Sequence, residues 1–178
     1  EITRAQRHGH PFCVVQIDLD DFKNVNDTFG HPVGDHALRE LASVLAADLR
    51  RSDILARVGA DEFAVLLPET ALADGLPVAE KLRQAIADTV LGLPVGAVRL
   101  TASVGLVCYP DNAADLQRLA IAADVALYKA KRSGKTKNEK RTLGQADPRG
   151  FAPVDVNYAQ ERRRRVAAES TPPAPPFW

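Results

Sequence analysis

Three carboxylates lie within four residues directly after the first apolar run of the sequence: Asp18, Asp20 and Asp21. Like charges at this spacing repel one another, so they cost stability unless solvent or a cation offsets the repulsion. Carboxylate oxygens are the ligands that Mg²⁺ prefers, usually one or two of them together with substrate phosphates. Asp20 and Asp21 equally fit the first turn of a helix, where negative charge is stabilising. We therefore take Asp18 as the metal-ligand candidate, with a helix cap as the alternative.

A second pair of acids, Asp61 and Glu62, stands at the tip of a predicted hairpin within the segment Arg57–Phe63. If this tip lies beside the end of the first strand, the two carboxylates complete a cation site with Asp18. By itself the hairpin is equally typical of an ordinary surface turn. Its role therefore depends on where the fold places it.

Two further pairs of residues have side chains suited to a nucleotide. Asn26 and Asp35 flank a glycine-containing turn, and an amide with a carboxylate matches the donor and acceptor groups of guanine. Helix capping is the alternative for this pair. Lys131 and Lys135 lie near a predicted helix end, where lysines either bind phosphates or complement the helix dipole.

Alternating strands and helices must position these groups. Apolar runs predict strands over 12–18, 54–58, 62–67 and 98–109, and apolar residues at helical spacing predict helices over 20–29, 32–50, 73–90 and 115–132. The inward faces of the three longer helices are expected to be Leu38, Leu41, Ala42, Leu45 and Leu49; Ala79, Leu82, Ile86 and Val90; and Leu116, Leu119, Ala120, Ala123 and Leu127. This order predicts an α/β fold, with a mixed central sheet covered by helices and a ferredoxin-like core.

The composition of the 178 residues limits the domain organisation and the class of protein. Six of the 12 prolines follow residue 140, so we expect one domain over 1–140 and a mobile Pro/Arg-rich tail over 141–178. Zero formal net charge argues against a dedicated nucleic-acid binder.

No apolar run reaches the ~18 residues of a membrane helix, so no membrane insertion is expected. Cys13 and Cys108 lie in apolar sequence and are expected to be buried thiols in the reducing cytoplasm, not a disulfide.

Four separated segments together resemble the GGDEF family of diguanylate cyclases. They read IDLDDFKNVNDTFGHPVGD, RRSDILARVGADEFAVLLP, TASVGLVCYP and ADVALYKAKRSGK, and the match covers residues 1–136. The resemblance implies a fold like the palm of nucleotide cyclases and polymerases. It also implies that two domains, each with one bound GTP, face each other as a homodimer and form cyclic di-GMP and two pyrophosphates. An upstream sensory domain is expected as a further partner.

The same resemblance implies roles for individual residues. Two Mg²⁺ ions, with Mn²⁺ as an alternative, would be held by Asp18, the Leu19 carbonyl and Asp61. Asp61 and Glu62 would be the catalytic residues. The GTP site would comprise Phe22, Lys23, Asn26, Asp35, Gly59, Ala60, Lys131 and Lys135. An inhibitory site for cyclic di-GMP would be formed by Arg50 and Asp53, completed by either Lys81 or Arg83; an arginine-rich helix end is the alternative for Arg50.

The signature departs from the family pattern, because it reads Gly59-Ala60-Asp61-Glu62-Phe63 with alanine in second place. If this position requires a positive φ, alanine costs about 1–2 kcal/mol of strain. Lys135 and Thr136 stand where the family commonly has Arg and Asn. Two functions therefore remain: a diguanylate cyclase with product inhibition, or a degenerate, non-catalytic domain that binds GTP or cyclic di-GMP as a receptor.

Overall fold

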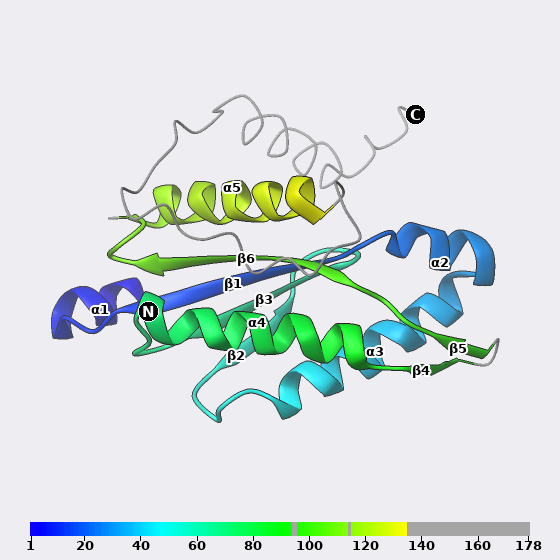
Figure 1. Ribbon diagram of the computed structural model, residues 1–178. Helices are drawn as coiled ribbons and strands as arrows, with labels where there is room; N and C mark the ends of the chain where they lie inside the picture. Colours follow the sequence, from blue (N-terminus) through cyan, green and yellow to red (C-terminus); the bar gives the residue numbers. More distant parts are fainter. Residues whose placement is uncertain (94–95, 114, 135–178) are drawn as a thin grey trace, which may run out of the picture. The chain divides into compact units, whose positions relative to one another are not determined.

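The computed structural model describes residues 1–93, 96–113 and 115–134 (Figure 1). The predicted tail and Lys135 lie outside these residues. Four strands form the central sheet in the order β2-β3-β1-β6, with the bounds β2 (Ile54–Arg57), β3 (Glu62–Leu67), β1 (Phe12–Leu19) and β6 (Ala102–Tyr109). A second, two-stranded sheet consists of β4 (Leu91–Leu93) and β5 (Gly96–Val98).

Every pair of neighbouring strands in the central sheet is antiparallel. The predicted α/β fold with a ferredoxin-like core is confirmed, but the sheet is antiparallel and not mixed. The helical crossovers do join strands of equal direction, β1 to β2 and β3 to β6. Each such pair is separated by a strand of opposite direction, β3 in the first case and β1 in the second, so the described strands form no parallel pair.

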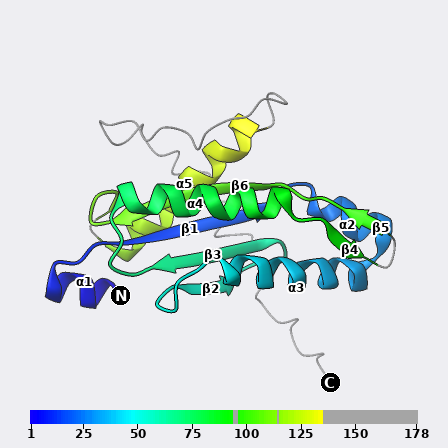
Figure 2. The ribbon, with the colours of Figure 1, turned by 60° about the horizontal axis from the view of Figure 1, so that its bottom comes forward.

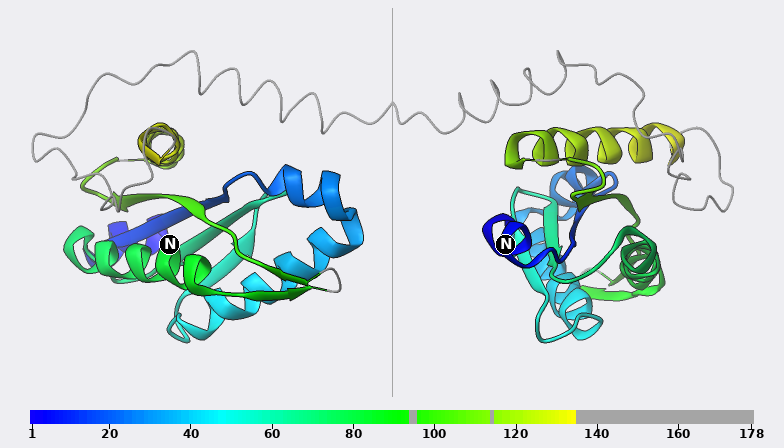
Figure 3. Two further views of the ribbon diagram at one scale, coloured as in Figure 1. Left: turned by 45° about the vertical axis from the view of Figure 1, so that its right-hand side comes forward. Right: turned by 90° about the vertical axis from the view of Figure 1, so that its left-hand side faces the viewer.

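Helices cover both faces of the central sheet. Those in the described residues are α1 (Ile2–His8), α2 (Phe22–Phe29), α3 (His31–Ala47), α4 (Leu72–Asp88) and α5 (Leu116–Gly134). Alternate side chains of a strand point to opposite faces. The odd-numbered residues of β1 from Cys13 to Leu19 pack in the core with α3 and α4, whereas Phe12 packs with residues of α5. Figures 1 and 3 show α5 on one face of the sheet and α3 with α4 on the other, and Figure 2 shows α4 crossing β1 and β6. No described helix is both long and apolar enough to cross a membrane.

The helices around the first acidic cluster have clear boundaries. α2 begins at Phe22, two residues later than predicted, because Asp20 and Asp21 form a turn in which Asp21 has a left-handed φ of 53°. Gly30 ends α2 with a φ of 85°, as expected for a residue without a Cβ, and Pro32 lies in the first turn of α3.

Three residues predicted to face inward are exposed. Val90 lies beyond the last residue of α4, and Leu116 and Ala120 fall outside the stripe of α5 that packs on the sheet, which is Leu119, Ala123 and Leu127. The predicted strand over 98–109 is also divided. Val98 belongs to the hairpin β4-β5, and β6 begins only at Ala102. Apolar periodicity does not show where a chain leaves one sheet and enters another, because both strands carry apolar side chains.

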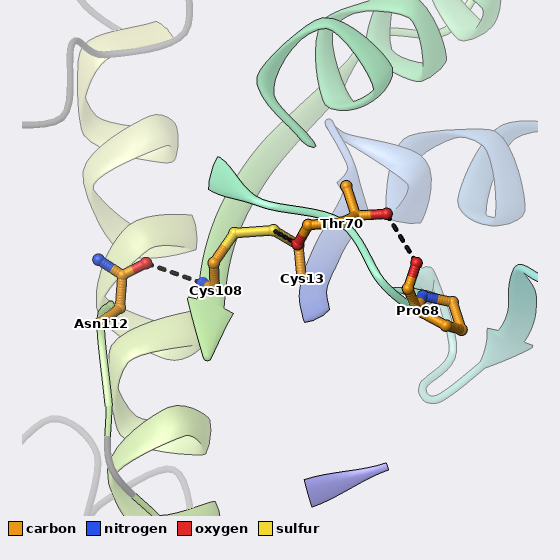
Figure 4. The surroundings of a disulfide bond; sticks show 5 residues. All are labelled: Cys13, Pro68, Thr70, Cys108 and Asn112. Carbon is orange, nitrogen blue, oxygen red and sulfur yellow. Dashed lines mark hydrogen bonds between the residues drawn. A yellow bond between two sulfur atoms is a disulfide. The ribbon is translucent and has the colours of Figure 1, made fainter. Parts of the chain in front are cut away.

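The prediction of two reduced thiols is wrong, because the structure joins Cys13 and Cys108 in a disulfide (Figure 4). The two residues are direct partners in the register of β1 with β6, their Cα atoms are 4.0 Å apart, and both are fully buried. Beside the bond, the backbone N–H of Cys108 donates to Oδ1 of Asn112 at 2.8 Å. The two cysteines are 95 residues apart in the sequence, so their pairing cannot be predicted without the register of β1 with β6.

Gly105 of β6 sets how closely α5 approaches the sheet. A Cβ at this position would lie 2.6 Å from the backbone nitrogen of Leu127 and 3.0 Å from the carbonyl carbon of Ala126. Both atoms belong to the helix backbone, so a side chain here can be accommodated only if the helix moves. Leu127 lies one turn before Lys131, so the same contact determines how that lysine is placed over the sheet.

We expect Gly105→Ala to lower the free energy of unfolding by about 1–3 kcal/mol, the usual cost of overpacking. The matched control is Gly92→Ala in β4, where a Cβ would meet no atom within 4 Å. Urea unfolding followed by circular dichroism measures both variants. Equal stability of the two variants would contradict the close backbone packing of α5 on β6.

Candidate functional site

The strand register brings the predicted acids together at one end of β1. Asp18 is the cross-strand partner of Glu62 on β3 and of Ser103 on β6. The next residue, Leu19, donates its backbone N–H to the carbonyl oxygen of Asp61 at 3.0 Å. The tip of the β2-β3 hairpin therefore lies beside the end of β1, which is the arrangement that a shared cation site requires.

Asp18 is a buried carboxylate with a lysine partner. Its side chain is 8% exposed, and its Oδ2 accepts a hydrogen bond of 2.6 Å from Nζ of Lys131 on α5. Burial raises the pKa of Asp18 above its ordinary value; Lys131 lowers it, and the charges of Asp61 and Glu62 raise it further. The site thus holds more negative charge than one lysine neutralises, which favours binding of a cation.

The hairpin tip is held in shape by its own backbone and by Arg57. Nε and Nη2 of Arg57 donate to the carbonyl oxygens of Gly59 and Ala60 at 3.1 and 2.9 Å. A Cβ on Gly59 would lie 2.8 Å from Oε2 of Glu62, so this glycine leaves room for the Glu62 side chain. Arg57 belongs to a segment singled out in the sequence, but its side-chain contacts were not predicted.

Ala60 is accommodated in the signature turn without backbone strain. In the described residues, Asp21 and Glu69 are the non-glycine residues with a positive φ, so the condition under which Ala60 would be strained is not met. Its side chain is exposed. Alanine at this position is therefore compatible with the backbone of the turn.

The two predicted guanine-binding residues lie on the adjoining helices α2 and α3. Asn26 is in α2 and packs against Gly34, which directly precedes Asp35 in α3. A Cβ on Gly34 would lie 1.9 Å from Oδ1 of Asn26 and 3.3 Å from Cζ of Phe22. The sequence analysis did not single out Gly34, which packs against the candidate residue Asn26; its signal is a glycine inside a helix, where glycine is otherwise unfavourable.

The donor set fits Mg²⁺ in the way this ion is usually held. In the part of the chain that the structure describes, no three Asp, Glu, His or Cys side chains converge into a metal-binding group. The predicted ligands Asp18, Asp61 and the Leu19 carbonyl would supply two carboxylates and one carbonyl oxygen. Mg²⁺ commonly takes one or two carboxylates and completes its shell with water and phosphate oxygens, so a partial set is what a nucleotide-bound ion needs.

The residues of the predicted inhibitory site lie away from this edge, in the turn between α3 and β2. Asp53 accepts a hydrogen bond of 2.8 Å from the backbone N–H of Arg50. Lys81 of α4 reaches Asp48, two residues before Arg50, with an Nζ–Oδ1 distance of 2.9 Å. Arg83 is instead bound through two nitrogens by Glu80 at 2.9 and 2.7 Å. Of the two candidates for completing this site, Lys81 is the one placed beside the turn.

A search of protein families matches residues 1–137 with the family described as diguanylate cyclase, GGDEF domain. The chain belongs to the GGDEF family. It is 38% identical to the response regulator PleD of Caulobacter vibrioides over 136 residues, 75% of this chain and 30% of PleD. It is 39% identical to the diguanylate cyclase DgcP of Pseudomonas aeruginosa over 139 residues, 78% of this chain and 21% of DgcP. The chain thus spans less than a third of the length of these relatives.

Solved structures agree with this membership. The crystal structure of the GGDEF domain of DgcB from Caulobacter crescentus, which is in complex with c-di-GMP, is similar with a TM-score of 0.67 at 30% identity. The similarity covers 74% of this chain and 78% of the DgcB chain. The α/β fold with helices flanking an antiparallel sheet is therefore a GGDEF fold.

Asp18→Asn is expected to raise the stability of the metal-free GGDEF domain. Burial raises the pKa of Asp18, so the folded protein loses stability when this carboxylate is ionised. This cost falls as the pH drops through the folded pKa towards the ordinary value, so the advantage of Asp18→Asn should shrink in acid. We expect a higher Tm for Asp18→Asn than for the parent at pH 7. A gain of about 1 kcal/mol in unfolding free energy raises Tm by roughly 2–4 °C for a domain of this size.

Differential scanning calorimetry at pH 7 and pH 4 measures this prediction. The control is Asp27→Asn, which changes an exposed acid of α2. A lower Tm for Asp18→Asn than for the parent at pH 7 would show that the Lys131 contact outweighs the cost of burial.

Proposed function

We propose that this domain is a catalytically competent diguanylate cyclase, which condenses two GTP molecules into cyclic di-GMP and two pyrophosphates as half of a homodimer. The observation that carries the proposal is the meeting of Asp18, Asp61, Glu62 and Lys131 at one end of β1. Family membership supports it, because relatives of this chain are diguanylate cyclases.

In this proposal, Asp18, Asp61 and the Leu19 carbonyl hold two Mg²⁺ ions, or Mn²⁺ as an alternative. When bound, these ions lower the pKa of the ribose 3′-hydroxyl and neutralise charge on the α-phosphate and the leaving pyrophosphate. Glu62 lies beside them on β3. Because Gly59 leaves room for its side chain, Glu62 keeps its place next to Asp18.

Lys131 has two partners in this mechanism. In the metal-free protein its ammonium compensates Asp18 at 2.6 Å. If Asp18 held a divalent cation, Lys131, which is 37% exposed, would turn from this carboxylate towards solvent. There it would bind the terminal phosphates, together with Lys23, Lys135 and the backbone N–H groups of residues 21–23 at the start of α2.

Guanine would be recognised by Asn26 and Asp35. The carboxylate accepts from N1–H and the exocyclic amine of guanine, two donors that adenine does not present together. Gly34 supports this role by allowing Asn26 to pack at the start of α3. The proposal further places product inhibition at Arg50 and Asp53, with Lys81 as the additional basic residue, because arginine forks and carboxylates match phosphate and guanine edges.

Asp61→Asn is expected to reduce cyclic di-GMP formation by about 100-fold or more, since it removes a charge that stabilises the transition state. Ala60→Gly is expected to stay within about twofold of the parent, because Ala60 is unstrained and exposed. The assay incubates the domain, fused to a dimerising coiled coil, with GTP and Mg²⁺ and quantifies cyclic di-GMP by chromatography. Asp111→Asn, an exposed acid beyond the other end of β6, is the control.

Two outcomes would contradict this proposal, and a third would contradict the expectation for Ala60→Gly. Near-parental turnover of Asp61→Asn would remove the hairpin acid from the metal site. Absence of product from the fused parent, with cyclic di-GMP still bound, would make the domain a receptor. A large gain in turnover for Ala60→Gly would show that alanine impairs the active site by something other than backbone strain.

Arg50→Ala is expected to weaken cyclic di-GMP binding by about tenfold or more, the effect of losing hydrogen bonds from a charged group. Arg51→Ala is the matched control, because Arg51 is the exposed neighbouring arginine and has no assigned role. Isothermal titration calorimetry with cyclic di-GMP measures both variants, and circular dichroism reports their folding. Equal affinities of the two variants would place the product site elsewhere.

A further inference from the structure

Asp20, the residue that follows β1, is joined to the start of β6 by three hydrogen bonds. Its Oδ2 accepts from Oγ1 of Thr101 and its Oδ1 accepts from Oγ of Ser103, both at 2.8 Å. Its backbone N–H donates to the carbonyl oxygen of Thr101, also at 2.8 Å. Both oxygens of this carboxylate are therefore engaged by the protein, although the residue belongs to the acidic cluster.

The three bonds hold the turn that separates the two halves of the proposed site. The residue before Asp20 is Leu19, whose carbonyl is a proposed metal ligand. The residue after it is Asp21, with a left-handed φ of 53°, and α2 with its proposed phosphate-binding N–H groups begins at Phe22. A left-handed conformation costs a non-glycine residue about 1–2 kcal/mol, so this turn needs stabilising contacts from outside itself.

We propose that Asp20 is a positioning residue, which together with Thr101 and Ser103 forms a latch that sets the Leu19 carbonyl and the first N–H groups of α2 relative to each other. The proposal rests on the proposed function of the site. It gives a role to the segment Thr101-Ala102-Ser103, which resembles the family but has no assigned chemistry. Asp20 acts through the backbone, and its carboxylate does not bind the metal.

Five variants test the latch, one of them a triple variant that combines Asp20→Ala with Thr101→Val and Ser103→Ala. Asp20→Ala removes both acceptors, and Thr101→Val with Ser103→Ala removes both donors but keeps the carboxylate. Asp20→Asn keeps both contacts, because its Oδ1 still accepts from Ser103 and its amide N–H can donate to the hydroxyl oxygen of Thr101. Asp27→Ala, on the exposed side of α2, is the control.

The measurement is isothermal titration calorimetry of GTP and of GMP in the presence of Mg²⁺. We expect Asp20→Ala and the double variant each to weaken GTP binding by about tenfold, and the triple variant to be no weaker than either. The affinity of the same variants for GMP, which lacks the terminal phosphates, should fall by less than about twofold. Asp20→Asn should bind GTP with the affinity of the parent. If Asp20→Ala fails to fold, the double variant and Asp20→Asn carry the test.

Three results overturn the latch. Parental GTP affinity of both Asp20→Ala and the double variant would make the hydrogen bonds incidental. Loss of GTP binding in Asp20→Asn but not in the double variant would make Asp20 a direct metal ligand. Equal losses of GTP and GMP would indicate general distortion. A parent domain that does not bind GTP with Mg²⁺ would instead overturn the proposed function, and the latch with it.

Discussion

The antiparallel register of β1 with its two neighbours is the constraint on which the site depends. It pairs Asp18 with Glu62 on one side and with Ser103 on the other, and it brings the hairpin tip to Leu19. A shift of one residue in either pairing would turn every side chain of the shifted strand to the opposite face. The cores on both faces of β1 oppose such a shift, so hydrophobic packing far from the site holds the acids together.

The buried carboxylate of Asp18 at the end of β1 also requires a positive charge beside it. A carboxylate that is 8% exposed, with two further acids close by, is stable only when positive charge approaches it. Lys131 supplies positive charge to Asp18, and Gly105 allows α5 to come close enough to present this lysine. The same glycine that tightens the packing of α5 on β6 thus serves the electrostatics of the site.

Small residues recur where the site needs close approach. Gly34 leaves space for Asn26 and Gly59 leaves space for Glu62, whereas Ala60 occupies an exposed position without a positive φ. Alanine in the second place of the signature is therefore compatible with the backbone conformation of this turn.

The sequence by itself determined the types and order of the main elements, the α/β class and the family, because apolar periodicity and motif spacing are local properties of the chain. It also identified the acids, Asn26 and Lys131 as candidates. Only the tertiary structure decided the Cys13–Cys108 disulfide, the β4-β5 hairpin, the exposure of Val90, and the contacts of Asp20 with Thr101 and Ser103. The disulfide and the Asp20 contacts join segments more than 80 residues apart, and the other two depend on where the chain turns, so each is set by how the elements pack and not by local pattern.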